Sequence, residues 1–352
     1  MKILITGICG FVGSRLAHYL SQDARFPSVE ICGIDNFSRS GSWENRSNLL
    51  EKGIQVVHGD IRSPSDLESL GRFDHVIDAA ANPSVLAGTG TDSSRRLVEN
   101  NLIGTINTLE CCKRWQAGFV LLSSSRVYSI QALRGLELKE QNNAFVLANE
   151  DAAYSHHGVT EDFPTKAPVS LYGATKLASE QLALEYAHAF DFPVWVNRCG
   201  VLAGAGQFGK SDQGIFSFWL HSWREQRPLE YIGFGGRGLQ VRDCLHPHDL
   251  AEAVALQLTG DLPTTPPVLN LSGGHSSATS LAQLSQWCSA RWDENVVRSI
   301  ETERPFDVPW IVLDNRRAQS MLGWRPQISV ERILEEIAAF AEQRSDWIEL
   351  SR

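Results

Sequence analysis

Tyr172 and Lys176 have the residue types and the spacing needed to exchange a proton with a hydroxyl group. On a helix, side chains four residues apart lie one turn apart on the same face. A free tyrosine has a pKa of about 10, and a cation within about 4–6 Å lowers such a pKa by about 1–3 units. A lysine together with a second positive charge would make the phenol a base for an alcohol that is being oxidised. A Tyr-x-x-x-Lys pair alone is more often an ordinary surface feature. Whether it is catalytic here therefore depends on the elements predicted around it.

A glycine-rich turn near the N-terminus predicts a cofactor for this chemistry. The apolar strand Lys2–Thr6 leads into Gly7, Gly10 and Gly13, and a helix is expected over about Ser14–Leu20. Together they form the dinucleotide fingerprint, whose glycines let a pyrophosphate approach backbone N–H groups at a helix N-terminus. Spaced glycines are a weak signal by themselves because turns collect glycine. The prediction therefore rests on the strand before them and the helix after them.

An acidic residue at the expected distance favours NAD over NADP. Asp35 and Asn36 follow the next predicted strand, Val29–Ile34. A carboxylate about 20 residues beyond the glycines accepts hydrogen bonds from the adenosine ribose and repels a 2′-phosphate. Arg39 and Arg46 are close by in the sequence, so NADP stays open. With NAD bound, the positive nicotinamide ring would join the lysine in lowering the tyrosine pKa.

Alternating apolar segments predict the architecture. Strands are expected at Ile54–His58, Asp74–Ala79, Phe119–Ser123 and Pro193–Arg198, and helices at Ser65–Leu70, Arg96–Arg114 and Ser170–Phe190. Such alternation implies a Rossmann-like α/β fold with a doubly wound parallel sheet, whose ligands bind beyond the carboxyl ends of the strands. At Asp60-Ile61 an acidic side chain could meet the adenine amino group, and at Ala79, Ala80 and Asn82 small residues would let a cofactor pass.

Ser124 is the third residue that could do chemistry. Its hydroxyl, at a strand end, could hydrogen-bond the substrate oxygen that Tyr172 deprotonates. A run of three serines is by itself a polar turn, and only the downstream Tyr-x-x-x-Lys pair makes catalysis the better interpretation. Arg242 and Arg304 could bind a diphosphate, since guanidinium groups suit phosphate oxygens. Solvated surface arginines are an equally good interpretation of these two positions.

Composition changes along the chain suggest two domains. We expect a cofactor-binding domain over residues 1–200, with a lid-like insertion around 129–169, and a smaller substrate domain over residues 201–352, with the chain crossing back between them. Long polar segments inside a domain are usually lids or binding loops. The insertion contains His156 and His157, but no cysteine or carboxylate stands at ligand spacing from them, so no metal site is predicted.

Bulk properties limit the partners and the compartment. The 352 residues have a formal net charge of −9, which argues against a general affinity for nucleic acid or anionic membranes but not against a small anionic ligand. The seven cysteines are scattered and without metal-ligand spacing, as expected for free thiols in a reducing compartment. No apolar run reaches the length of a membrane span. A cytoplasmic protein is predicted.

The assembled motifs resemble those of the extended short-chain dehydrogenase/reductases that act on nucleotide sugars. They are Thr6-Gly7-x-x-Gly10-Phe11-x-Gly13, Asp35-Asn36, Gly59-Asp60-Ile61, Asn101-x-x-Gly104-Thr105, Ser123-Ser124-Ser125 with Val127-Tyr128, Tyr172-x-x-x-Lys176, Arg242-Asp243 with His246 and Asp249, and Leu322-Gly323-Trp324-x-Pro326. This combination extends over nearly the whole chain and is very specific for the family.

The resemblance implies roles for individual residues. Ser124, Tyr172 and Lys176 would be the catalytic set, and NAD would stay bound through turnover. The cofactor would be bound by Gly7, Gly10, Phe11, Val12, Gly13, Asp35, Asn36, Ser38, Arg39, Asp60, Ile61, Ala79, Ala80, Asn82, Asn101, Tyr172, Lys176 and Cys199. The nucleotide sugar would be bound by Ser84, Ser124, Gln207, Phe208, Gln213, Gln240, Arg242 and Arg304. A homodimer is expected through a helix bundle that includes the Tyr172 helix.

Within the family the chain is most similar to the CDP-paratose 2-epimerases, also called CDP-tyvelose epimerases. Gln207-Phe208, Asp212–Gly214, Gln240–Asp243 and the insertion before Tyr172 support this likeness. The 4,6-dehydratases have Thr-Asp-Glu at Ser124-Ser125-Arg126, so water elimination would lack its acid/base pair here. The expected reaction is transient oxidation of a sugar carbon followed by hydride return on the opposite face. Another nucleotide-sugar 4-epimerase, a net reductase or dehydrogenase, and a catalytically silent NAD sensor remain alternatives.

Overall fold

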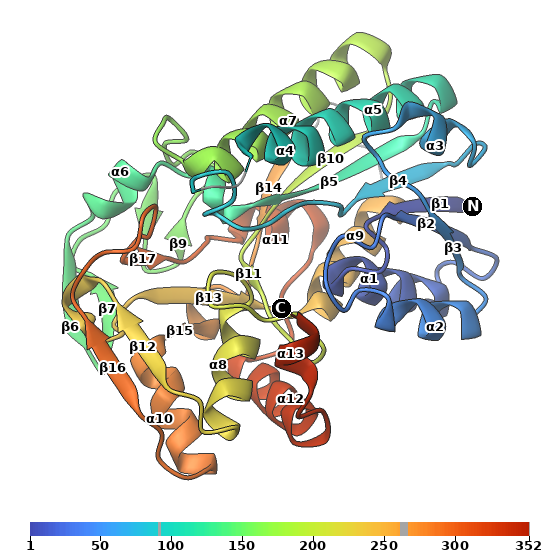
Figure 1. Cartoon of the computed structure of the whole chain (residues 1–352). Coiled ribbons are helices and arrows are strands. Elements are labelled where there is room, and N and C mark those ends of the chain that lie inside the picture. The colour runs from blue at the N-terminus through green and yellow to red at the C-terminus, as the bar shows by residue number, and fades with distance from the viewer. Residues whose placement is uncertain (91–92, 261–266, 352) are drawn as a thin grey trace.

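A parallel sheet of seven strands organises the N-terminal part of the molecule (Figure 1). The computed structural model describes residues 1–90, 93–260 and 267–351. Within these residues the strand order is β14-β10-β5-β4-β1-β2-β3, and every neighbouring pair is parallel. The strands are β1 (Lys2–Thr6), β2 (Glu30–Asp35), β3 (Gln55–His58), β4 (His75–Asp78), β5 (Gly118–Ser124), β10 (Val194–Cys199) and β14 (Val268–Leu271). The predicted doubly wound α/β fold is confirmed.

Helices cover both faces of this sheet, because its strands are apolar on both sides. Figure 1 shows α4 (Ser94–Val98), α5 (Gly104–Trp115) and α7 (Ser170–Phe190) over one face, with α3 (Pro64–Glu68) beside them. The other face has α1 (Phe11–Gln22), α2 (Glu44–Glu51), α9 (Pro247–Thr259) and α11 (Arg316–Leu322). Two separate hydrophobic cores fill the spaces between the sheet and these layers. Of the helices described, none is long and apolar enough to cross a bilayer.

The helix predicted at Arg96–Arg114 is interrupted. It begins at Ser94 and contains a π-helical turn over Glu99–Ile103 between α4 and α5. Such turns place one extra residue in the helix and often occur at functional sites. Here the turn contains Asn101, whose buried amide accepts from Asn82 N at 2.8 Å and donates to Asn82 O at 3.0 Å. Sequence periodicity missed the interruption because the π turn continues directly from α4 into α5, with no proline or other helix-breaking residue within it.

The remaining chain forms a second unit and also returns to the first. Helix α9 packs on α1, and β14 completes the edge of the large sheet beside β10. The second unit contains a mixed sheet of β11 (Val201–Leu202), β13 (Val241–Leu245), β15 (Ala278–Ser280) and β17 (Trp310–Ile311). Around it lie α8 (Ile215–Arg224), α10 (Leu281–Arg291), α12 (Val330–Gln343), α13 (Trp347–Ser351) and the pair β12 (Leu229–Ile232) and β16 (Val297–Ile300).

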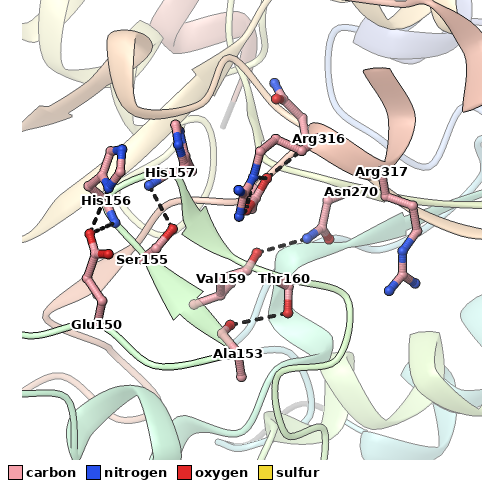
Figure 2. A network of polar contacts seen from close by, with 12 residues as sticks. Glu150, Ala153, Ser155, His156, His157, Val159, Thr160, Asn270, Arg316 and Arg317 are labelled. Atoms are coloured by element: carbon pink, nitrogen blue, oxygen red, sulfur yellow. Dashed lines mark hydrogen bonds and ion pairs between the residues drawn. The ribbon is translucent and has the colours of Figure 1, made fainter. Parts of the chain in front are cut away.

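The insertion around 129–169 is a folded element. It contains α6 (Ile130–Arg134), the hairpin β6 (Leu138–Gln141) and β7 (Ala144–Leu147), and the short pair β8 (Tyr154–Ser155) and β9 (Gly158–Val159). Its apolar side chains share a core with residues of β13 and β17. Val159 N donates to Val312 O at 2.8 Å, and its carbonyl accepts from the Asn270 amide at 3.0 Å (Figure 2). The insertion therefore joins the two units.

Gly158 explains how closely the insertion approaches the second unit. Its φ is +126°, and a Cβ placed there would lie 2.5 Å from the backbone nitrogen of Asp314. His156 and His157 lie at the exposed end of the same pair of strands. His156 Nδ1 is 2.7 Å from Glu150 Oε1, and His157 N donates to Ser155 Oγ at 3.2 Å (Figure 2).

A buried histidine in α8 makes the stability of the second unit depend on pH. His221 is 1% exposed, and neither ring nitrogen has a hydrogen-bond partner among the described residues. Burial, with a smaller effect of Arg224 and Arg227, lowers its pKa to about 4. Between about pH 6.5 and pH 4 the unfolded chain binds a proton at this site and the folded chain does not, so acidification destabilises the fold.

We therefore predict that His221→Phe removes a stability loss of about 2–3 kcal/mol between pH 7 and pH 4. Urea unfolding followed by fluorescence at several pH values would measure it. His188→Gln, which changes an exposed histidine of α7, is the control and should leave the pH dependence unchanged. Parallel pH profiles for wild type and His221→Phe would contradict the assignment.

Candidate functional site

A cavity of about 1010 Å³ lies beyond the carboxyl ends of the sheet strands, between the sheet and the second unit. It is lined by every predicted catalytic, cofactor-binding and substrate-binding residue except Asn101. None of residues 129–169, all of which the structure describes, lines it. The expectation of a lid in that insertion is therefore corrected: its apolar residues are committed to the core that they share with β13 and β17.

The glycine-rich turn forms a cradle that fits a dinucleotide. Gly7 has a φ of +64°, and a Cβ there would lie 2.8 Å from Ala80 Cα. A Cβ at Gly13 would lie 2.4 Å from Gly7 O, so only glycine permits this closeness of turn and helix. The turn leads into the N-terminus of α1, whose first N–H groups face the cavity side of the sheet. The residues present thus fit the pyrophosphate of NAD.

The adenosine end of the cradle is acidic. Asp35 accepts from Cys9 N at 2.9 Å and from Phe37 N at 2.8 Å, which fixes the carboxylate at the end of β2. Burial raises its pKa, against the hydrogen bonds from Phe37 and Cys9. Asp60 accepts from the Asn36 amide at 2.9 Å, and its pKa is held well below its usual range chiefly by Arg62. Each oxygen of Asp35 accepts one of these hydrogen bonds and still has a lone pair for a ligand hydroxyl. Asp60 also accepts from the backbone and the guanidinium of Arg62, so its lone pairs are already engaged.

Arg39 is turned away from this acidic end. Its guanidinium donates to Phe208 O and, at 3.0 Å, to Gln213 Oε1. Those donors are therefore engaged by the second unit rather than directed at a 2′-phosphate. This geometry fits NAD, with Asp35 facing the ribose position.

Asn101 does not line the cavity, which corrects its prediction as a direct cofactor contact. Its side chain is 1% exposed and binds the backbone of Asn82, as described above. Its amide also donates to Thr175 Oγ1, on α7, at 3.3 Å. Asn101 thus fixes the loop after β4 against α7, and the neighbouring Asn100 lines the cavity in its place.

Tyr172 points into the cavity beside Ser124. The tyrosine is buried, and burial raises the pKa of its phenol, while a hydrogen bond with the Ser124 side chain acts in the opposite direction. The cation that lowers this pKa is Arg126. Lys176, one turn along α7, instead donates from Nζ to Leu122 O at 2.9 Å, and burial lowers its own pKa. The ammonium takes this acceptor because a buried donor needs a partner.

The second unit contributes two arginines, Arg242 and Arg304, to the cavity wall. Arg242 Nη2 lies 2.7 Å from Asp307 Oδ1 and also donates to Val308 O at 2.8 Å. Arg304 Nη1 donates to Ser211 O at 2.8 Å. Two of the predicted diphosphate-binding residues therefore already have protein acceptors, which orient them in the cavity wall.

Residues of the segment 207–214 line the cavity and are hydrogen-bonded to residues of the first unit. Asp212 Oδ2 accepts from Ser84 Oγ at 2.5 Å, and Gln213 accepts from Arg39, so both ends of the cavity are connected to it. Phe208 anchors the segment, since its ring stacks on Trp347 with centroids 5.1 Å apart. The sequence analysis predicted Gln207, Phe208 and Gln213 as substrate contacts, and all three line the cavity.

A buried charge network behind the cavity was missed by the sequence analysis. Glu180 is fully buried on α7 and pairs with Arg198 of β10 at 2.8 Å. The carboxylate also accepts from Ser123 Oγ, next to Ser124, the predicted catalytic serine. The signal was available: Glu180 is four residues after Lys176 and eight after Tyr172, so all three share one face of the helix. A charged residue on the buried face of a helix requires a partner.

Comparisons with known proteins give a consistent result. The model of a family described as the NAD dependent epimerase/dehydratase family matches residues 3–271. The chain is 28% identical over 342 residues to the CDP-paratose 2-epimerase of Salmonella typhi, covering 94% of this chain and 96% of that protein. It is 24% identical over 356 residues to a UDP-glucuronate 4-epimerase of Thermodesulfobacterium geofontis, covering 98% and 97%.

Solved structures of similar proteins include the same class of enzyme. The UDP-glucuronic acid 4-epimerase from Bacillus cereus in complex with UDP-glucuronic acid and NAD matches with a TM-score of 0.79 and 25% identity, over 97% of this chain and 99% of that one. A UDP-glucose 4-epimerase from Thermotoga maritima matches with a TM-score of 0.78 and 22% identity, which shows the shared fold.

The network behind the cavity yields a prediction about stability. Glu180→Gln leaves the buried Arg198 without a counter-charge, and loss of one partner of a buried pair costs about 3–5 kcal/mol. Urea unfolding should show this loss for Glu180→Gln and a change within about 0.5 kcal/mol for Glu185→Gln, an exposed position on the same helix. Equal effects of the two substitutions would mean that the pair does not stabilise the fold.

Proposed function

Because this chain belongs to the NAD dependent epimerase/dehydratase family, we propose that it epimerises the sugar of a CDP-linked nucleotide sugar at C2, as a CDP-paratose 2-epimerase does. The relatives described above are nucleotide-sugar epimerases, and the chain is an enzyme of that kind with NAD as cofactor. The proposed cytidine nucleotide and the proposed reaction at C2 are supported by the likeness to CDP-paratose 2-epimerase over 94% of the chain. Relatives that act on UDP-glucuronate or UDP-glucose make a 4-epimerase the main alternative.

One observation favours epimerisation over water elimination. The cavity places the Ser124 hydroxyl and the Tyr172 phenol together, and position 126, just beyond them, is an arginine. Elimination needs an acid that donates a proton to the leaving hydroxyl, and a guanidinium is not such an acid near neutral pH. Epimerisation needs one group that takes a hydroxyl proton and returns it.

The roles of the residues follow from their positions. Bound NAD would supply hydride acceptance from the sugar carbon and hydride return. Tyr172 takes the hydroxyl proton, and Ser124 donates a hydrogen bond to the same sugar oxygen and keeps it in reach of the phenol. Lys176 would hold the cofactor ribose once its Nζ is shared between that ribose and Leu122 O. Arg126 favours the phenolate form of Tyr172. General-base catalysis of this kind contributes about 10²–10⁴ in rate.

We also propose a homodimer and a cytoplasmic location. The outer surface of α4, the π turn and α7 exposes Val98, Ile103 and Leu171, apolar side chains that a second copy would cover. Light scattering of the purified protein should give twice the monomer mass of 39.0 kDa. All seven cysteines are buried and unpaired, which supports a reducing compartment.

Tyr172→Phe is the direct test of the base. The variant should lose about 10²–10⁴ in kcat while native mass spectrometry still detects bound NAD. Tyr186→Phe is a matched control, because Tyr186 lies on the same helix and donates to Glu110 at 2.6 Å outside the cavity. Full activity in Tyr172→Phe would exclude the phenol as the base.

A panel of CDP, UDP, GDP and dTDP sugars tests the substrate. We expect a CDP sugar to be converted with no accumulation of NADH, and NMR of the product should show inversion at C2. Inversion at C4 of a UDP sugar would replace the proposal with a 4-epimerase. Steady NADH production or consumption would indicate a net dehydrogenase or reductase, and tight NAD binding without turnover of any sugar would indicate a sensor.

A further inference from the structure

Arg126 is fixed at the reacting end of the cavity by its own backbone. Its N–H donates to Ser124 Oγ at 3.2 Å. Its carbonyl oxygen packs against the first turn of α7, where a Cβ on Gly173 would lie only 2.2 Å away. Arg126 is thus held between the serine and Tyr172, and its side chain lines the same cavity.

The guanidinium of Arg126 has fewer protein acceptors than those of Arg39 and Arg242, which also line the cavity. Its side chain has one hydrogen bond, a long one of 3.5 Å from Nη1 to Phe306 O, and no ion pair among the described residues. Arg242, by contrast, has Asp307 and Val308 O as acceptors. Burial and the nearby charge of Arg242 lower the pKa of Arg126 to about 10, so the group is still a cation near neutral pH. Most donors of this partly buried cation are therefore free to bind an anion that enters the cavity.

We propose that Arg126 binds an anionic oxygen group of the substrate immediately next to the reacting sugar carbon. This inference rests on the proposed function, because it places the reacting carbon at Tyr172. Two groups have the required chemistry. If C2 reacts, Arg126 can reach the β-phosphate on the oxygen of the neighbouring anomeric carbon. If C4 reacts, Arg126 can reach a carboxylate on the neighbouring C5. Whether Arg126 binds the phosphate or the carboxylate therefore indicates which carbon reacts.

Isothermal titration of wild type and Arg126→Gln with small ligands tests the assignment without turnover. The probes are CDP, UDP, GDP and dTDP with their monophosphates, and the pair UDP-glucose and UDP-glucuronate. If Arg126 binds the β-phosphate, the best diphosphate should bind about 10- to 100-fold more weakly to the variant while its monophosphate is unaffected. If it binds a sugar carboxylate, diphosphates should be unaffected and UDP-glucuronate alone should weaken, by a similar factor.

Arg134→Gln is the matched control. Arg134 also contacts the 306–307 backbone, donating to Asp307 O at 2.9 Å, but it lies outside the cavity. Retained NAD and an unchanged unfolding midpoint would show that Arg126→Gln is folded, and Arg126→Lys should recover part of the affinity, since it restores the charge without the planar fork.

Changes below about twofold for every ligand, or equal losses in Arg134→Gln, would overturn the inference, as would a wild type that binds no nucleoside diphosphate. The proposed function and the anion site can be contradicted independently. If no sugar is turned over but Arg126→Gln loses diphosphate affinity, the anion site is supported and the proposed function is not. If the protein is an active epimerase and Arg126→Gln changes no affinity, the proposed function is supported and the anion site is not.

Discussion

The ion pair between Glu180 and Arg198 is the constraint on which the catalytic geometry depends. Both side chains are buried, so each charge is tolerable only while the other is 2.8 Å away. The pair sets the position of α7 relative to β10, and the hydrogen bond from Ser123 to the same carboxylate extends it to β5. Tyr172 and Lys176 lie on that face of α7. The ion pair between Glu180 and Arg198 therefore also aligns Tyr172, the proposed base, with the end of β5.

The same network reaches the insertion and so makes it part of the site's support. Arg198 donates to Glu161 O at 3.0 Å and lies over the ring of Tyr128, whose hydroxyl donates to Asn270 at 2.6 Å. Asn270 N in turn donates to Glu161 Oε1 at 2.8 Å. A segment that contributes nothing to the cavity wall thereby completes the hydrogen bonding of the charges beneath it. This explains why the insertion is packed tightly rather than poised to open.

Local signals in the sequence were sufficient for the sheet and for the cavity residues. Each strand of the sheet is a short apolar run that ends in, or is directly followed by, a glycine, serine or acid, and parallel strands collect those ends at one edge. The sequence analysis was wrong where tertiary contacts determine the position of a residue or segment. Asn101 faces inward because of a π turn that no periodicity reveals, and the polar insertion folds because β13 and β17 offer it an apolar surface. Likewise, the orientation of Lys176 toward Leu122 O depends on a carbonyl from a distant strand.

The residue at position 126 connects the electrostatics of the cavity to the class of reaction. A carboxylic acid there could donate a proton to a departing hydroxyl, and the sugar would lose water. A guanidinium keeps its proton even where burial lowers its pKa to about 10. In the proposed mechanism proton transfer then falls to Tyr172, and a group that takes a proton and gives it back leaves the sugar with its original composition. In that mechanism the cavity changes the configuration of a carbon, and position 126 offers no acid to remove the oxygen.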